Sequence, residues 1–280
     1  MKQAETAADG VDTQRRIDAH PFWYHTIDVI PGVTTPGWFD LRRVVDVMPW
    51  PDVRGKRCLD IGTFDGFFAF EMERRGAAEV LAIDVEDHTQ WDWPPDAREA
   101  ADSERQVAFT GPPKGAGFRL IADLIDSKVE WQPLSMYDVS VEEIGSFDLV
   151  VCGTLLLHLR DPIRALEAVR RVCHGHLLSS EQIELWLSLI GRGQPLFRLS
   201  GTGQTCRWWL PNGAGHRQLV FSAGFQVEQI SKPYMVAFNA HPKPKRNLTS
   251  LPRDVALRAL TGTWQQGVLH RALLARPRCF

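Results

Sequence analysis

The segment between residues 56 and 84 constrains the fold most strongly. KRCLDIG, over residues 56–62, is a short apolar strand that runs into a glycine-containing turn. FFAFEMERRG, over residues 67–76, follows as a helix with clustered apolar residues and a stop at Gly76. EVLAID, over residues 79–84, is a second strand. This order predicts a βαβ unit of a parallel sheet.

The alternation of strands and helices continues downstream. The fourth predicted strand, over residues 147–159, is almost wholly apolar, as expected of a central strand buried on both faces. Asp161 and Pro162 then open a helix, as its N-cap and its first residue. The sequence predicts an α/β fold with a mainly parallel sheet. The further strands are expected over residues 129–139, 147–159 and 174–183, with a closing pair over residues 225–238 and 270–277.

The turn after the first strand reads DIGTFDG, and its spacing limits the ligand. A dinucleotide-binding turn places glycines where the backbone must touch a pyrophosphate. Here Phe64 and Phe67 stand at the second and third of those positions, which argues against NAD and FAD. A nucleoside without pyrophosphate fits better, and S-adenosylmethionine is the commonest such ligand. Asp84 lies 24 positions after Asp60, close to the spacing of about 20 at which an acid binds ribose hydroxyls. The alternative is a plain βαβ turn with an incidental acid.

Three segments interrupt the α/β alternation: the N-terminal cap and two insertions. We expect residues 1–18 to be a disordered tail, residues 19–50 the cap, and residues 51–280 one domain with the insertions at about 87–128 and 191–215. Long irregular insertions tend to be lids or binding loops. The chain holds ten tryptophans, an excess that indicates either an aromatic core or an aromatic pocket. Six of them fall in these segments: Trp23, Trp38, Trp91, Trp93, Trp208 and Trp209.

Composition excludes several classes of protein. The net charge is −2, and no apolar run approaches the roughly 20 residues that span a bilayer. The N-terminus lacks the apolar core of a secretory signal. The five cysteines show no CxxC pair, so we expect a cytoplasmic protein without a structural zinc site.

Charge is unevenly distributed along the chain. From residue 241 onward, eight basic residues stand against Asp254 alone, so this segment carries +7 and the first 240 residues carry −9. One interpretation is a solvated arginine-rich surface. The other is a surface for an anionic partner such as RNA.

These motifs together resemble a known family. The segments WYHTID, TPGWFDLR, GKRCLDIGTFDGFFAFEMERRGA, LAIDVED, FDLVVCGTLLLHLRDP and HRALLARP carry the likeness, which runs from about residue 21 to residue 277. They resemble the class I S-adenosylmethionine-dependent methyltransferases, and within them the tRNA wobble-uridine (5-oxyacetic acid type) branch. The resemblance implies a seven-stranded Rossmann-like sheet with an N-terminal cap.

The resemblance also implies a cofactor site. Gly62 would approach the methionine end of the cofactor, and Gly153 would lie under its sulfur. Asp84 would bind the ribose hydroxyls. Met136 and Tyr137 would flank the adenine. The full set of candidate cofactor residues is Trp38, Arg43, Asp60, Gly62, Thr63, Asp84, Val85, Glu86, Met136, Tyr137, Gly153, Leu157 and Arg271.

Members of this branch use carboxy-S-adenosylmethionine and hold its extra carboxylate with a lysine, a tyrosine and an arginine. Arg271 matches the arginine, but the other two positions fall on Ala19 and Leu157. A buried carboxylate without two of its three partners is poorly satisfied. We therefore expect ordinary S-adenosylmethionine as the cofactor.

Acid–base and acceptor-binding residues are less sharply defined. His158 follows the fourth strand and His25 lies in the cap, so both are candidate bases for a hydroxyl acceptor. The alternative for His158 is packing against the next helix. Candidate rings for stacking on a flat acceptor are Trp91, Trp93, Trp208 and Trp209, although these side chains can equally hold the lids to the sheet.

Three functions remain open on this basis. The favoured one is O-methylation of a small molecule, such as a secondary metabolite or a saccharide, in an aromatic-lined pocket. The second is a tRNA wobble-uridine methyl- or carboxymethyltransferase that binds tRNA through the basic C-terminal segment. The third is a non-catalytic protein that binds S-adenosylmethionine and RNA.

Overall fold

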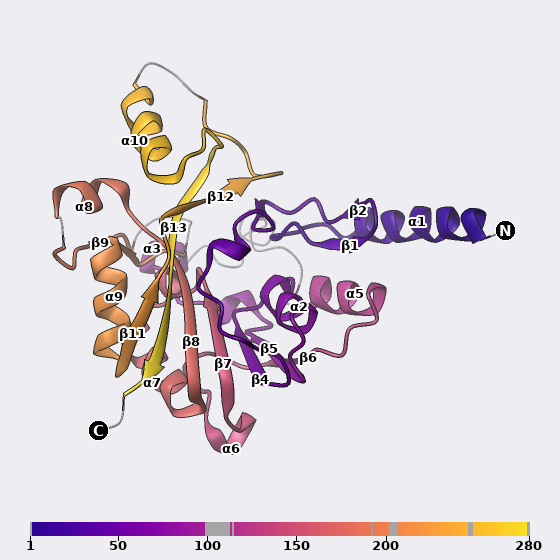
Figure 1. Cartoon of the computed structure of the whole chain (residues 1–280), viewed down its shortest axis with the longest axis horizontal. Helices are drawn as coiled ribbons and strands as arrows, with labels where there is room; N and C mark the ends of the chain where they lie inside the picture. Colours follow the sequence, from indigo (N-terminus) through magenta and orange to yellow (C-terminus); the bar gives the residue numbers. More distant parts are fainter. Residues whose placement is uncertain are drawn as a thin grey trace.

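A central β-sheet with helices on both faces organises the chain (Figure 1). The computed structural model describes residues 2–98, 113, 115–191, 193–201, 206–245 and 249–278. Within these residues the main sheet has nine strands, in the order β3-β12-β13-β8-β7-β4-β5-β6, with β11 paired to β13.

Five parallel strands, in the order β8-β7-β4-β5-β6, form one side of the sheet. β13 (Gly267–Pro277) runs antiparallel to β8, and β11 (Phe225–Ile230) runs antiparallel to β13. These seven strands confirm the predicted Rossmann-like α/β arrangement. The parallel strands are β4 (Arg57–Ile61), β5 (Glu79–Asp84), β6 (Glu130–Pro133), β7 (Phe147–Gly153) and β8 (Cys173–Gln182).

Two additional strands extend the sheet beyond the seven that the resemblance implied. β12 (Tyr234–Phe238) pairs with the first residues of β13, and β3 (Phe39–Asp40) pairs with β12. The eleven-residue length of β13 makes this possible, because its later residues pair with β11 instead. The predicted closing segment 225–238 is therefore two strands that pair with different parts of β13.

Two apolar cores lie on opposite faces of the sheet, as the two-residue period of a strand requires. On one face, α2 (Phe67–Arg74) and α5 (Ala116–Leu124) pack with the cap. On the other face, α6 (Val141–Ile144), α7 (Pro162–Val172) and α9 (Gly213–Ser222) pack against the strands. The predicted N-cap of α7 is confirmed, since the Asp161 side chain accepts a hydrogen bond from Arg164 N at 3.1 Å.

The N-terminal segment differs from its prediction. Residues 1–18 were expected to be disordered, but α1 (Lys2–Ala19) is a helix that extends from the body of the molecule (Figure 1). Its last turns are anchored, because Ile17 is fully buried and its carbonyl accepts a hydrogen bond from Trp23 Nε1 at 3.0 Å. Arg16 also pairs with Asp123 of α5 at 2.5 Å. The partner Asp123 lies 107 positions away, and local composition does not reveal such a contact.

The cap follows α1 and joins the sheet edge. It contains the hairpin of β1 (Asp28–Ile30) and β2 (Val33–Thr34), then β3 and the 3₁₀ turn η1 (Val45–Val47). β3 attaches the cap to the main sheet through β12. The cap is thus fixed to the edge of the sheet that lies beyond β13.

The fourth predicted strand is shorter than expected. β7 ends at Gly153, and residues 156–158 form the 3₁₀ turn η3 (Leu156–His158). The intervening Thr154 has a positive φ of 55°, which reverses the chain where β7 ends.

The predicted insertions carry short elements of their own. The first contains η2 (His88–Gln90), α3 (Pro95–Arg98) and α5, and the second contains β9 (Phe197–Leu199) and β10 (Trp209–Pro211). α8 (Leu185–Ile190) precedes the second insertion, and α10 (Leu251–Thr261) lies between β12 and β13. Parts of the predicted insertions lie outside the described residues. None of the helices described is long and apolar enough to cross a membrane.

Candidate active site

The glycine turn between β4 and α2 lies next to the end of β5. Gly62 and Gly66 have φ values of 71° and 94°, a conformation that favours glycine. A Cβ atom on Gly62 would lie 2.8 Å from Leu155 Cδ2, so a side chain there would meet the segment after β7. Asp84, at the end of β5, is joined to the turn, because its Oδ2 accepts a hydrogen bond from Phe64 N at 2.9 Å. The structure therefore brings together the turn and the acid that the sequence predicted as neighbours.

Asp60 and Thr63 lie beneath this turn and are buried. Asp60 Oδ2 accepts a hydrogen bond from Ala69 N, in α2, at 3.1 Å. Burial raises the pKa of Asp60 to about 7. Asp60 thus stabilises the first turn of α2 through this hydrogen bond.

The residues after β5 and β6 continue the candidate site along the carboxyl ends of the parallel strands. Val85 N donates a hydrogen bond to Asp84 Oδ1 at 2.8 Å, and the exposed Glu86 lies 3.6 Å from Arg119. Met136 is buried. Tyr137 Oη donates to Asp92 Oδ2 at 2.6 Å and accepts from Asp161 N at 3.0 Å. Tyr137 therefore connects the first insertion with the start of α7.

The turn also holds the cap in place. Asp65 Oδ2 accepts hydrogen bonds from Tyr24 N at 2.6 Å and from His25 N at 2.8 Å. Sequence reasoning missed this role of Asp65, since it counted the glycines of the turn and passed over the acid between them. The contact places the cap directly over the glycine turn.

His25 lies at this junction. Its side chain is buried, and its Nδ1 is 4.0 Å from Asp65 Oδ2 without a hydrogen-bond partner among the described residues. Burial lowers the pKa of His25 to about 3, so the ring is neutral at pH 7. Trp38, farther along the cap, contacts the rings of Phe22 and His241, and Arg43 is exposed.

His158 lies in η3, after β7. Its Nδ1 contacts the carbonyl oxygen of Cys206. A carbonyl only accepts hydrogen bonds, so Nδ1 carries the proton and Nε2 is the basic nitrogen. Burial lowers the pKa of His158 to about 4.

Gly153, at the end of β7, faces the ring of Phe68, and a Cβ atom on Gly153 would clash with that ring.

The four candidate stacking tryptophans hold the inserted segments together. Trp91 and Trp93 stack on each other with ring centroids 5.5 Å apart. Trp93 Nε1 donates to His88 O at 2.7 Å, and Trp208 Nε1 donates to Asp92 O at 2.6 Å. Trp209 Nε1 donates to Arg160 O at 3.1 Å. These donors fix the lids, and contact of any of these rings with an acceptor stays a prediction.

Buried polar side chains in β8 were not predicted as site residues. Ser180 Oγ lies 2.6 Å from Tyr234 Oη. Glu181 Oε2 accepts a hydrogen bond from Leu157 N at 2.9 Å. Burial raises the pKa of Glu181 to about 8. A signal was available in the sequence, because the polar run SSE at residues 179–181 follows the apolar pair Leu177 and Leu178 within a predicted strand.

The positions that bear on carboxy-S-adenosylmethionine are now placed. Leu157 is buried in the core, and Ala19 is the last residue of α1. Arg271, in β13, donates from Nε to Ser231 O at 3.1 Å. Its Cα is the register partner of Glu181 in β8.

The basic residues of the C-terminal segment do not gather on one face. Arg253 and Arg258 lie on α10, at one end of β13, whereas Arg276 and Arg278 lie at or just beyond its other end (Figure 1). Ten residue steps of extended chain separate the ends of β13 by roughly 33 Å. Arg276 also pairs with Glu228 at 3.0 Å. Arg246 lies outside the described residues.

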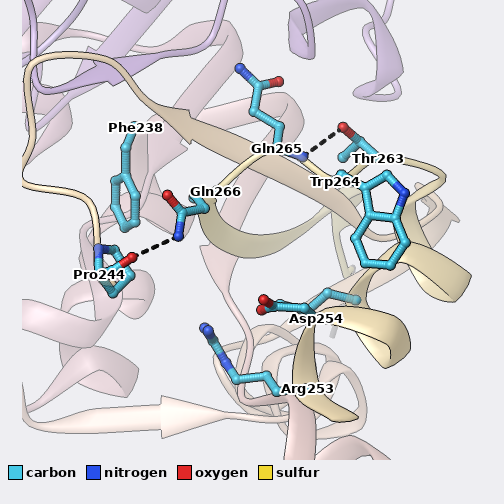
Figure 2. A pocket seen from close by; sticks show the side chains of 10 residues that line it. Phe238, Pro244, Arg253, Asp254, Thr263, Trp264, Gln265 and Gln266 are labelled. Atoms are coloured by element: carbon cyan, nitrogen blue, oxygen red, sulfur yellow. Dashed lines mark hydrogen bonds between the residues drawn. The ribbon is translucent and has the colours of Figure 1, made fainter. Parts of the chain in front are cut away.

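A hollow beside α10 lies away from the glycine turn. It is lined by ten residues from the end of β12, from α10 and from the start of β13, among them Phe238, Asp254 and Trp264 (Figure 2). The side chain of Gln266 donates a hydrogen bond to Pro244 O at 2.7 Å across it. This hollow is shallow, and none of the predicted site residues lines it.

Comparison with known proteins identifies the family. The sequence model of a methyltransferase domain family matches residues 40–229, more than half of the chain. The chain belongs to this methyltransferase family. The match spans the strands from β4 to β8 and the glycine turn, whereas His25, Trp38 and Arg271 lie outside the matched residues.

Individual relatives are more distant. The chain is 31% identical over 117 residues to a ubiquinone biosynthesis O-methyltransferase of Neisseria meningitidis, which covers 42% of this chain and 39% of that protein. It is 28% identical over 191 residues to the enzyme of the same name from Xanthomonas euvesicatoria, which covers 64% of this chain and 66% of that protein. The methyltransferase chain thus spans less than two-thirds of the length of these relatives.

One solved structure shares the fold over the full length. The crystal structure of the [4+2]-cyclase SpnF superposes with a TM-score of 0.54 at 17% identity, covering 100% of this chain and 97% of that chain. A fold of this kind therefore occurs in a protein named for a different reaction, and the activity has to be argued from the site.

Proposed function

We propose that this methyltransferase transfers the methyl group of S-adenosylmethionine to a hydroxyl oxygen of a small molecule. The observation that carries the proposal is the contact between the glycine turn and Asp84, at the carboxyl ends of β4 and β5. Ligands of open α/β sheets bind at this edge. Phe64 occupies a position where a dinucleotide-binding turn needs a glycine for the backbone to approach the pyrophosphate. This favours a nucleoside without pyrophosphate as the ligand.

The described residues fit such a nucleoside. Gly62 offers a side-chain-free surface, and Asp84 offers a carboxylate beside it for the ribose hydroxyls. Met136 and Tyr137 follow the neighbouring strand, where the adenine would lie. When bound, the cofactor supplies an electrophilic methyl group on a sulfonium sulfur. The chain contributes orientation and exclusion of water, since the cap is tied to the turn through Asp65.

A small-molecule acceptor is supported by two observations. The relatives named above are called ubiquinone biosynthesis O-methyltransferases. The cap adds aromatic rings beside the turn, since Phe22 and Tyr24 lie with ring centroids 6.0 Å and 4.9 Å from that of Phe64. Such a wall suits an aromatic acceptor and a cationic donor.

Replacing Asp84 tests the cofactor site. Asp84→Asn keeps an oxygen for Phe64 N but removes the charge and one acceptor for the ribose. We expect the Kd for S-adenosylmethionine, measured by isothermal titration calorimetry, to rise about tenfold or more. Asp52→Asn, a half-exposed acid paired with Arg54 before β4, serves as the control and should leave the Kd unchanged. Equal Kd values for Asp84→Asn and the unchanged protein would contradict the proposed site.

The wobble-uridine alternative makes a different prediction. It requires carboxy-S-adenosylmethionine and tRNA, and its support in this chain is Arg271 together with the basic C-terminal segment. The mass of the nucleoside that co-purifies with the protein separates the two cofactors. Binding of unmodified tRNA that weakens steeply with salt would favour the tRNA alternative. Cofactor binding without turnover on any acceptor would favour the non-catalytic alternative.

A further inference from the structure

Glu181 is an ionisable residue buried in a central strand, an arrangement that destabilises the folded protein and therefore points to a function. It lies in a central strand, its side chain is almost fully buried at 1% exposure, and it carries an ionisable group. Oε2 accepts the hydrogen bond from Leu157 N, but the equally buried Oε1 has no hydrogen-bond partner among the described residues. A buried polar atom without a partner costs about 1–3 kcal/mol.

The surroundings of Glu181 connect it to the turn that follows β7. Oε2 contacts the η3 turn, whose Leu155 also faces Gly62 of the cofactor turn. No ion pair of Glu181 occurs within the described part of the chain. The charge of Glu181 contributes to the raised pKa values of Tyr24 from the cap, Tyr234 from β12 and Cys152 from β7. Arg271 is its register partner on β13.

We propose that Glu181 Oε1 accepts the proton of the acceptor hydroxyl, and that this hydroxyl is phenolic. The inference rests on the proposed function. The oxygen–methyl bond forms while the sulfur–methyl bond breaks, and that electron pair stays on sulfur, which gives S-adenosylhomocysteine. The hydroxyl proton passes to ionised Glu181 Oε1 and then to solvent when the products leave.

The electrostatics of the site agree with this assignment. A proton acceptor works best when its pKa lies near the working pH. Burial raises the pKa of Glu181 to about 8, whereas burial lowers the pKa values of His25 and His158 to about 3 and 4. Glu181 is therefore the strongest of these three bases. Its pKa lies about two units below that of a phenol such as tyrosine, which is about 10.

The rings around the turn favour the same acceptor class. The ring of Tyr24, whose pKa the charge of Glu181 helps to raise, lies 4.9 Å from that of Phe64 and 5.0 Å from that of Phe39 between centroids. A flat phenol bound against these rings would direct its hydroxyl toward a buried carboxylate. A saccharide has no aromatic face to match them.

The first experiment measures the titration of Glu181 directly. Protein saturated with S-adenosylhomocysteine is titrated from pH 5.5 to pH 9.5, and the infrared band of the protonated carboxyl is followed. Asp60, whose pKa burial raises to about 7, contributes a band in both proteins, so we expect a second band that disappears with a midpoint near 8 and is absent only from Glu181→Gln. Glu228→Gln is the matched control, since Glu228 pairs with Arg276 near the far end of β13. Identical spectra for the unchanged protein and Glu181→Gln would overturn the proposal.

The second experiment measures methyl transfer to catechol, caffeate and 4-hydroxybenzoate from radiolabelled S-adenosylmethionine. Glu181→Gln should lower kcat about 100-fold or more at pH 8 and remove the acidic limb of the pH profile, with the Kd for S-adenosylhomocysteine unchanged. Gln retains an oxygen for Leu157 N, so thermal unfolding checks that the fold is kept. Unchanged kcat and pH profile would overturn the base assignment, and methyl transfer to none of the phenols would overturn the acceptor class. Failure of the unchanged protein to bind S-adenosylmethionine would instead refute the proposed function.

Discussion

Single acidic residues determine how the parts of this methyltransferase meet. Asp65 is the clearest case, because one buried carboxylate oxygen accepts the backbone N–H groups of both Tyr24 and His25. Hydrogen bonds to an ionised acceptor are about twice as strong as neutral ones. The cap is therefore held to the cofactor turn by one side chain.

Replacing Asp65 should loosen the cap. Asp65→Ala leaves two N–H groups without their acceptor, and each unsatisfied buried group costs about 1–3 kcal/mol. We expect the free energy of unfolding in urea to fall by about 2–4 kcal/mol. Asp12→Ala, an exposed acid on α1, should change it by less than about 0.5 kcal/mol. A loss for Asp65→Ala as small as that of the control would mean that the cap is held by other contacts.

At this scale the sequence revealed residues that belong to a spaced motif. Asp60, Gly62 and Asp84 were found because strand ends and turn spacing place them together. Asp65 was missed because its partners lie 41 and 40 positions away. Glu181 stands in a visible polar run, but its partner Leu157 lies 24 positions away. Only the fold brings such partners into contact.

Among the secondary-structure elements, the inserted segments depend on each other. Asp92 O, in the first insertion, accepts a hydrogen bond from Trp208 Nε1 in the second, and Tyr137 Oη donates to the Asp92 side chain. The two lids are thus bound to each other as well as to the rim of the site.

Removing one donor tests this coupling of the lids. Trp208→Phe keeps an aromatic ring but loses the hydrogen bond to Asp92 O, which contributes about 1 kcal/mol. We expect amide hydrogen exchange in residues 88–98 to become several-fold faster. Trp264→Phe, at an exposed position beside α10, should leave exchange in that segment unchanged. Unaltered exchange in Trp208→Phe would show that the lids move independently.

The elements that sequence predicted well are those with a strong local signal. The apolar runs of β4, β5 and β7 and the capped start of α7 were found because burial on both faces and capping act locally. β3 and β12 were not separated from their neighbours, since their pairing depends on the length of β13. The helix α1 was missed because its anchors lie elsewhere in the chain.

For the whole molecule, the buried titratable groups fall into two sets with opposite effects on stability. Burial raises the pKa values of Asp60 and Glu181 to about 7 and about 8. Burial lowers the pKa values of four histidines to between about 3 and about 4: His25, His158, His216 and His270. Unfolding returns all six groups to ordinary values.

The two sets predict a stability maximum near pH 6.5. Between about pH 4.5 and 6.5 the unfolded chain binds protons on four histidines, while the folded chain keeps them on two carboxyls, so stability rises with pH. Above pH 6.5 the unfolded histidines become neutral and the folded carboxyls hold more protons, so stability falls toward pH 8. The slopes on both sides should be on the order of 1–3 kcal/mol per pH unit.

Urea unfolding at pH 5.5, 6.5 and 8.0 measures this dependence. Glu181→Gln removes the carboxyl with the higher pKa. The protons that the unfolded histidines still bind just above pH 6.5 then outweigh those on Asp60, so the decrease between pH 6.5 and 8.0 should disappear. His176→Gln, at a surface histidine paired with Glu228, should leave the shape of the curve unchanged. A free energy of unfolding that keeps rising through pH 8 would contradict protonated buried carboxyls in the folded state. It would thereby also remove the electrostatic support for Glu181 as a proton acceptor.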